Sequence, residues 1–143
     1  MSLRGEAAII GIGELPTQRS TPGRSMLGLL GDAARIAIKD AHIRKDDVDG
    51  IVTEGGATYP ASVAEYLGIR DVRFGTGSSM MGASGATGIA IASMAVMNGL
   101  ANNVLVLMGV ARNPALGGGG EGFGGPGGEF EMPYGTAAGA NTG

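Results

Sequence analysis

Short apolar runs alternate along this chain with longer segments that carry apolar residues at helical spacing. Runs of four to eight residues rich in Ile, Val and Leu are typical of buried strands, whereas longer segments with a three-to-four-residue period predict helices. Ser25 and Pro60 are favourable helix starts, and Gly68 is a favourable helix end. We therefore expect strands at 7–12, 51–53, 72–74 and 104–108, and helices at 25–43, 61–67 and 83–97.

Strands that alternate with helices indicate an α/β fold with parallel strands and right-handed crossovers. The strands read as continuous apolar runs, as expected for a parallel sheet covered on both faces. The first helix carries one apolar face. That face comprises Leu29, Ala33, Ile36, Ala37 and Ala41.

The helix at 83–97 is rich in small residues. Gly82, Gly85 and Gly88 recur every third residue at its start, and alanines follow them. A glycine inside a helix costs about 1 kcal/mol relative to alanine, a cost that close backbone approach can justify. We therefore expect this helix to be central, covered on all sides and the most buried, with the free amides of its amino end directed at a site.

The residue pattern changes after Arg112. Residues 117–128 contain nine glycines and cannot pack a core of their own. Residues 113–143 then end in small and polar residues, with no closing strand or helix in the pattern. We expect an incomplete α/β domain at 1–112, followed by a glycine-rich loop and the start of a further segment at 113–143.

Composition narrows the classes of function. The net charge is −3, no basic patch stands out, and the chain has three Tyr, three Phe and no Trp, which argues against nucleic acid and anionic membrane surfaces as partners. The absence of cysteine removes thiolate metal ligands and a thiol nucleophile, and fits a cytoplasmic location. The uncharged stretch 74–111 is interrupted by Asn and Gly, so we expect a buried helix and strand there, not a membrane span.

Several local motifs do not meet the requirements of the sites they suggest. Gly11-Ile12-Gly13 lacks the third glycine and the adjoining helix of a dinucleotide site. The acidic run Asp46-Asp47-Val48-Asp49 lacks the spacing of a calcium loop, so we expect a polar turn. Ser84 is not in a nucleophile elbow, and the lone His42 near the end of the first long helix is expected to be solvated.

The order and spacing of several segments resemble the N-terminal third of thiolase-superfamily proteins, nearest the sterol-carrier-protein-X or lipid-transfer type. These segments are AAIIGIGELP, PGRS before a long helix, DAHIRKDDVDGIVT, PASVAEYLGI, GASGATGIAIASMAVMNGLANNVLVLMG and EFEMPYG. The resemblance implies a layered half-fold with a mostly parallel sheet and a buried Gly/Ala central helix. Because thiolases place a nucleophilic cysteine at the start of that helix, the resemblance puts Gly82 at the nucleophile position.

The resemblance implies an enzyme that acts on acyl-CoA thioesters, forming or cleaving a C–C bond without an acyl-enzyme. It implies substrate contacts at Met81, Gly82, Ser84 and Tyr134, coenzyme A thioester as the substrate, and neither a bound metal nor a covalent cofactor. Cysteine-less relatives include aldolases that cleave the side chain of steroid acyl-CoAs together with an OB-fold, zinc-binding partner. The alternative is a non-catalytic acyl-CoA- or lipid-binding or scaffold subunit of the same fold. We expect the 143 residues alone to lack thiolase activity.

The resemblance also implies a homodimer. In thiolase-like dimers the short strand before the central helix pairs with its two-fold mate, which corresponds here to residues 72–82. We expect Met80 and Met81 near both the partner and the acyl pocket, because methionine adapts to varied apolar shapes. The alternative is that these residues are ordinary core of one chain.

Overall fold

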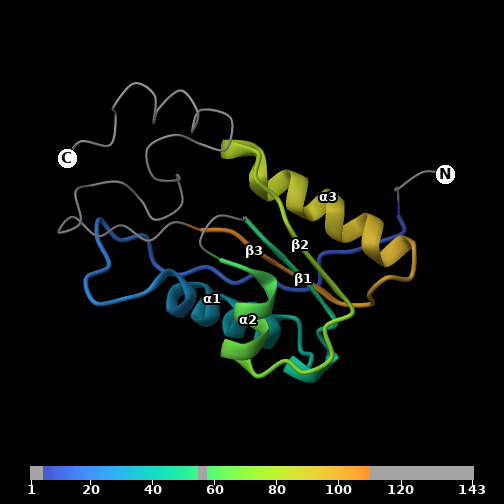
Figure 1. The fold of residues 1–143 in the computed structure, drawn as a ribbon, viewed down its shortest axis with the longest axis horizontal. Helices are drawn as coiled ribbons and strands as arrows, with labels where there is room; N and C mark the ends of the chain where they lie inside the picture. Colours follow the sequence, from blue (N-terminus) through green and yellow to red (C-terminus); the bar gives the residue numbers. More distant parts are fainter. Residues whose placement is uncertain (1–4, 55–57, 110–143) are drawn as a thin grey trace, which may run out of the picture.

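The computed structural model describes residues 5–54 and 58–109. Its elements follow one another as alternating helices and strands after residue 25 (Figure 1). In chain order they are α1 (Met26–Asp40), the 3-10 turn η1 (Lys45–Asp47), β1 (Gly50–Thr53), α2 (Pro60–Leu67), β2 (Phe74–Gly77), the 3-10 turn η2 (Met81–Ala83), α3 (Ser84–Met97) and β3 (Val104–Leu107). The tail at 113–143, Tyr134 included, lies outside the described residues.

The described strands form one parallel sheet in the order β2-β1-β3. Gly50, at the start of β1, lies opposite Phe74 of β2 and Val104 of β3. Helices α1 and α2 lie on one face of the sheet and α3 lies on the other (Figure 1). The predicted α/β class with parallel strands is therefore confirmed.

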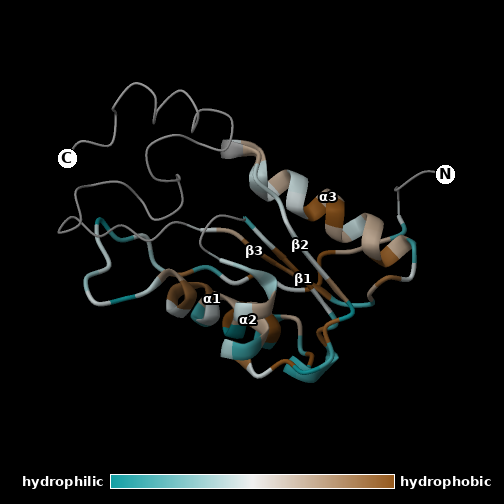
Figure 2. Ribbon diagram, viewed as in Figure 1, coloured by the Kyte–Doolittle hydropathy of each residue, from teal (hydrophilic) through white to brown (hydrophobic). Residues whose placement is uncertain are grey.

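The main core lies between the sheet and the α1/α2 layer. Ile51 and Val52 of the central strand are fully buried, and Figure 2 shows hydrophobic residues along β1 and β3. Local signals begin α1 and end α2 as expected. The Ser25 hydroxyl accepts from the Gly28 amide at 3.1 Å at the start of α1, and Gly68 adopts a left-handed φ of +69° after α2. No helix in the described ranges is long and apolar enough to cross a membrane.

The strand predicted at 7–12 is wrong. Residues 7–12 belong to no strand, and Ile9, Ile10 and Ile12 are 67%, 53% and 71% exposed. This segment is held by α1 instead of by the sheet: the Ile12 amide donates to the Asp40 carboxylate at 2.9 Å. A strand needs a neighbouring strand to satisfy its backbone groups, and none of the described strands lies beside this segment.

Two other boundaries and one face also differ from expectation. The strand expected at 72–74 spans Phe74–Gly77, and the first helix ends at Asp40, before 43. The face of α1 that enters the core carries Met26, Leu30 and Ala34. Of the predicted face, Leu29 and Ala37 are partly buried and pack against this core, whereas Ile36 is exposed.

The expectation that the helix at 83–97 is the most buried is also wrong. Only Ser84, Gly88 and Ala95 of α3 are buried, and Ile89 and Met94 are nearly half exposed. α3 covers the sheet with one side, and no described element covers its other side (Figure 1). The helix does approach the sheet closely at Gly88, where a Cβ would stand 3.0 Å from Val106 Cγ1 and 2.5 Å from Met108 Cε.

Asp49 fixes the amino ends of all three described strands. Its carboxylate accepts from the Asn102 and Asn103 amides at 2.8 and 2.9 Å, just before β3. Its carbonyl accepts from the amides of Arg73 and Phe74 at the start of β2. Burial raises the pKa of the Asp49 carboxyl, but these hydrogen bonds and nearby Arg73 outweigh burial and hold that pKa below its usual range. The charged form of Asp49 therefore stabilises the strand register.

Candidate functional site

The candidate site lies at the carboxyl edge of the sheet, where α3 begins. In open α/β sheets ligands bind outside the carboxyl ends of the parallel strands. The chain leaves β2 here and turns through Ser78 and η2 into α3. The Ser78 amide donates to the Thr53 carbonyl at the end of β1, at 2.7 Å. This bond fixes the turn before α3 against the central strand.

Ser84 shapes the turn at the start of α3. Its side chain is 2% exposed, and its hydroxyl accepts from the Met80 amide at 3.0 Å. The buried Ser78 hydroxyl donates to the Ser84 carbonyl at 3.2 Å. The Ser84 hydroxyl is thus committed to holding the backbone of residues 78–84, which is a positioning role.

The structure does not bring His42 to Ser84. His42 follows α1 and is exposed, and its Nδ1 lies 2.7 Å from the Asp40 carbonyl oxygen. The carboxyl end of α1 leads through η1 into the start of β1, so His42 lies toward the amino edge of the sheet, opposite the start of α3. The expectation of a solvated His42 is confirmed.

Gly82 lies in η2, immediately before the amino end of α3. It is exposed, and a Cβ built there would meet nothing within 4 Å among the described residues. Met80, directly before η2, is 58% exposed, and Met81 opens η2. The backbone therefore presents Gly82 at the surface beside the amino end of a 14-residue helix, with space for a side chain among the described residues.

Two parts of this edge were missed by sequence reasoning. The Glu54 side chain, directly after β1, accepts from the Gly109 amide beyond β3 at 3.3 Å. The buried Thr53 hydroxyl donates to the Thr58 carbonyl at 2.9 Å. Polar residues that directly follow a buried strand were the available signal, because parallel strands deliver such residues to one edge.

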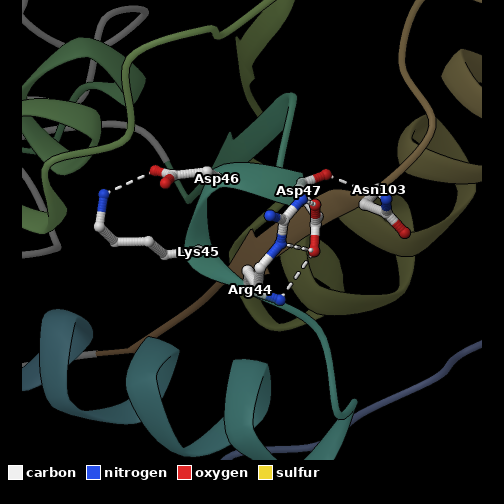
Figure 3. A network of polar contacts seen from close by, with 5 residues as sticks. All are labelled: Arg44, Lys45, Asp46, Asp47 and Asn103. Carbon is white, nitrogen blue, oxygen red and sulfur yellow. Dashed lines mark hydrogen bonds and ion pairs between the residues drawn. The ribbon is translucent and has the colours of Figure 1, made fainter.

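The acidic run at 46–49 forms a polar turn, as expected. Arg44, directly before η1, pairs with Asp47 at 2.6 Å, and Lys45 pairs with Asp46 at 2.6 Å (Figure 3). The hydrogen bonds and charge of Arg44 hold the pKa of Asp47 below its usual range, and those of Lys45 do the same for Asp46. Within the described ranges, no group of three or more His, Cys, Asp or Glu side chains could hold a metal ion.

Comparison with known proteins gives two curated relatives. The chain is 36% identical over 104 residues to a steroid side-chain-cleaving aldolase of Thermomonospora curvata, covering 72% of this chain and 26% of the relative. It is 35% identical over 104 residues to the 17-hydroxy-3-oxo-4-pregnene-20-carboxyl-CoA lyase of Mycobacterium tuberculosis, covering 72% of this chain and 27% of the relative. The chain thus spans about a quarter of the length of these relatives. No family model matches it.

Solved structures agree with this similarity. The fold matches the structure titled Ltp2-ChsH2(DUF35) aldolase with a TM-score of 0.63 and 37% identity, over 73% of this chain and 27% of that one. It also matches AbyA1, a tetronic acid condensing enzyme, with a TM-score of 0.54 and 23% identity, over 60% of this chain and 27% of that one. The second likeness concerns the fold alone. The relatives are thus enzymes that cleave a C–C bond, one of them in an acyl-CoA substrate.

Proposed function

We propose that this chain is the N-terminal part of a thiolase-like enzyme that cleaves a C–C bond in an acyl-CoA thioester without forming an acyl-enzyme. One observation carries the proposal: the amino end of α3 opens at the carboxyl edge of the sheet, and the two exposed residues directly before it, Gly82 and Ala83, carry no nucleophile. The similarity to two C–C-cleaving enzymes over 104 residues supports it.

Retro-aldol cleavage of a β-hydroxyacyl-CoA suits such a site. A base takes the β-hydroxyl proton, the oxygen forms a ketone or aldehyde, and the Cα–Cβ bond breaks. The electron pair of that bond passes into the thioester enolate, which is then protonated at Cα. The amides at the start of α3 suit stabilisation of the enolate oxygen, since charge develops there in the transition state. No step requires a covalent intermediate on Gly82.

The proposed substrate contacts are Met81, Gly82, Ser84 and Tyr134. Gly82 keeps a path open to the α3 amides, and Ser84 holds the turn that presents them. The open β2 edge of the described sheet supports the proposed homodimer through residues 72–82. An OB-fold, zinc-binding partner protein belongs to the same proposal, in line with the two-component name of the similar aldolase structure.

The test is a turnover and binding assay on the whole protein in which these 143 residues occur. The probe is 17-hydroxy-3-oxo-4-pregnene-20-carboxyl-CoA, with mass spectrometry of the shortened acyl-CoA and the released ketone. We expect Gly82→Leu to reduce kcat/KM at least tenfold, because its side chain would occlude the α3 amides. Asn98→Leu, at the exposed opposite end of the same helix, is the matched control and should retain activity.

The alternative function is a non-catalytic acyl-CoA- or lipid-binding subunit of the same fold. The observation that favours it is the commitment of the Ser84 hydroxyl to the backbone, with no histidine beside it. Calorimetric binding of the acyl-CoA, weakened by Gly82→Leu, with no product formed even with the partner protein present would establish the binder. Equal turnover in Gly82→Leu and the unaltered protein would contradict both forms of the proposal.

A further inference from the structure

A hollow of about 350 Å³ lies between the carboxyl half of α1, the turn η1 and the end of α2. Its lining consists of three cations and three aliphatic residues, with no acid: Arg35, Ile38, Lys39, Ile43, Lys45 and Leu67. The whole chain has a net charge of −3, so the hollow is of opposite sign to the protein that carries it. The hollow lies toward the amino edge of the sheet, because α1 and α2 lead from there into β1 and β2.

Two of the three cations are held in position by neighbouring residues. The Arg35 guanidinium lies over the Tyr66 ring, 5.4 Å from its centroid, and its Nη1 lies 3.0 Å from an Asp32 carboxylate oxygen. The Lys45 ammonium donates to the Gly68 carbonyl at 2.7 Å. Because these long side chains are already ordered, a ligand that binds them loses less conformational entropy than one that must first immobilise them.

The acids beside the hollow do not neutralise it. Asp32 is shared, because it pairs with Arg24 as well as with the arginine of the hollow. Asp46 pairs with Lys45 at 2.6 Å (Figure 3). The hydrogen bond from Lys45 lowers the pKa of Asp46 most, and the charge of Arg70 lowers it further. Each of these two carboxylates thus interacts with more than one cation, and the hollow remains positive.

Lys39 supplies a cation without an acidic partner. Its ammonium makes no hydrogen bond or ion pair with the described residues, and its side chain is exposed. The aliphatic residues of the hollow lie deeper: Leu67 belongs to the main core, and Ile38 and Ile43 pack against it. The hollow therefore has an aliphatic floor and a cationic rim.

We propose that this hollow docks an acidic segment of a protein partner, which places an aliphatic side chain on the floor and carboxylates against the three cations. The Arg35 and Lys45 side chains are 54% and 49% exposed, so the hollow is open, whereas a small-molecule site buries most of its ligand. A nucleic acid would bring phosphates but leave the aliphatic floor unmatched. Complementary charge at the rim of an interface steers the partner and fixes its orientation. The inference does not depend on the proposed function.

The experiment uses the whole protein in which these residues occur. The probe is a fluorescein-labelled peptide, Gly-Glu-Leu-Glu-Glu-Ile-Glu-Gly, and its binding is followed by fluorescence anisotropy at low salt. We expect saturable binding that weakens as salt is added. Lys39→Glu should raise Kd roughly threefold or more, because it replaces an exposed attraction by a repulsion. Arg19→Glu, an equal change of charge at an exposed position outside the hollow, is the matched control and should leave Kd unchanged.

A second peptide tests the aliphatic floor. It has serine in place of leucine and isoleucine, and it should bind more weakly than the first. The absence of saturable binding by the first peptide would overturn the proposal, and so would equal binding of the two peptides. Equal weakening by Lys39→Glu and Arg19→Glu would overturn it as well, by showing a general effect of net charge. Displacement by hexanoate as strong as by unlabelled peptide would show a small-anion site instead, and equally strong displacement by a single-stranded oligodeoxynucleotide would show a nucleic-acid site.

Discussion

A single cysteine at position 82 would measure how the amino end of α3 treats a negative charge. Gly82 is exposed and a Cβ there would meet nothing within 4 Å in the part of the chain that the structure describes, so Gly82→Cys should fold as the unaltered chain does. The chain has no other cysteine, so every thiol signal comes from the new residue. The matched control is Asn98→Cys, at the exposed carboxyl end of the same helix.

The expected shift in the pKa of each thiol follows from the helix dipole. A charge at a helix end is worth about 0.3–1 kcal/mol, favourable for an anion at the amino end and unfavourable at the carboxyl end. Since one pKa unit is about 1.4 kcal/mol, the pKa of the thiol in the Gly82→Cys variant should fall by roughly 0.2–0.7 unit from about 8.5. The pKa of the thiol in the Asn98→Cys variant should shift upward by a similar amount, so that the two differ by roughly 0.4–1.5 units.

The assay is the rate of iodoacetamide alkylation against pH, followed by intact-protein mass spectrometry, with circular dichroism to verify folding. Equal pKa values for the two thiols would refute the argument that the α3 amides are open to solvent at Gly82. We also expect Gly82→Cys to produce no thiolysis of acetoacetyl-CoA in the 143-residue chain, because no base lies beside it among the described residues. Turnover by that variant would contradict this expectation.

Three further predictions concern stability, the first two measured as the free energy of unfolding in urea. Gly88→Val should destabilise by roughly 1–3 kcal/mol because its side chain would press on Val106. Gly85→Ala should be neutral or stabilising, because a Cβ at Gly85 would meet nothing within 4 Å among the described residues. The reverse order of stability would contradict the packing of α3 against β3. Asp49→Ala should lower the free energy of unfolding by roughly 2–3 kcal/mol at pH 7. Because the pKa of Asp49 is lowered in the folded state, its contribution is present above about pH 4 and is lost as pH falls through the folded pKa. The free energy of unfolding of the variant should therefore depend less on pH in acid, and the same pH dependence in both proteins would contradict this. Gly13→Ala should release the amino-terminal segment from α1, since its Cβ would meet backbone atoms there, and unchanged amide exchange at residue 12 would exclude that.

Elements with local signals were predictable from the sequence. Ser25, Pro60 and Gly68 act within a few residues of themselves. α1 begins directly after Ser25, and α2 begins at Pro60 and ends before Gly68, as expected. The apolar runs that became β1 and β3 pair with each other, so their partner is present in the described chain. These elements depend on neighbours that the sequence pattern contains.

Elements that depend on distant neighbours were predicted less well. The run at 7–12 has the composition of a strand but no adjacent strand among the described residues, so burial did not follow from hydrophobicity. The same reason leaves one side of α3 exposed. At the site, the position of Gly82 before α3 came from the resemblance, whereas the roles of Ser78 and Glu54 required the spatial meeting of strand ends.

The space around Gly82 separates the side chain at position 82 from the described contacts that maintain the fold. Register is secured at the amino edge by Asp49, and the turn into α3 is held by Ser78 and Ser84, so none of these anchors includes the side chain at position 82. A substitution at position 82 can therefore change the surface beside the amino end of α3 while the strand register and the turn into α3 keep their anchors. The sequence can vary at this position independently of the contacts that hold the sheet and α3 together.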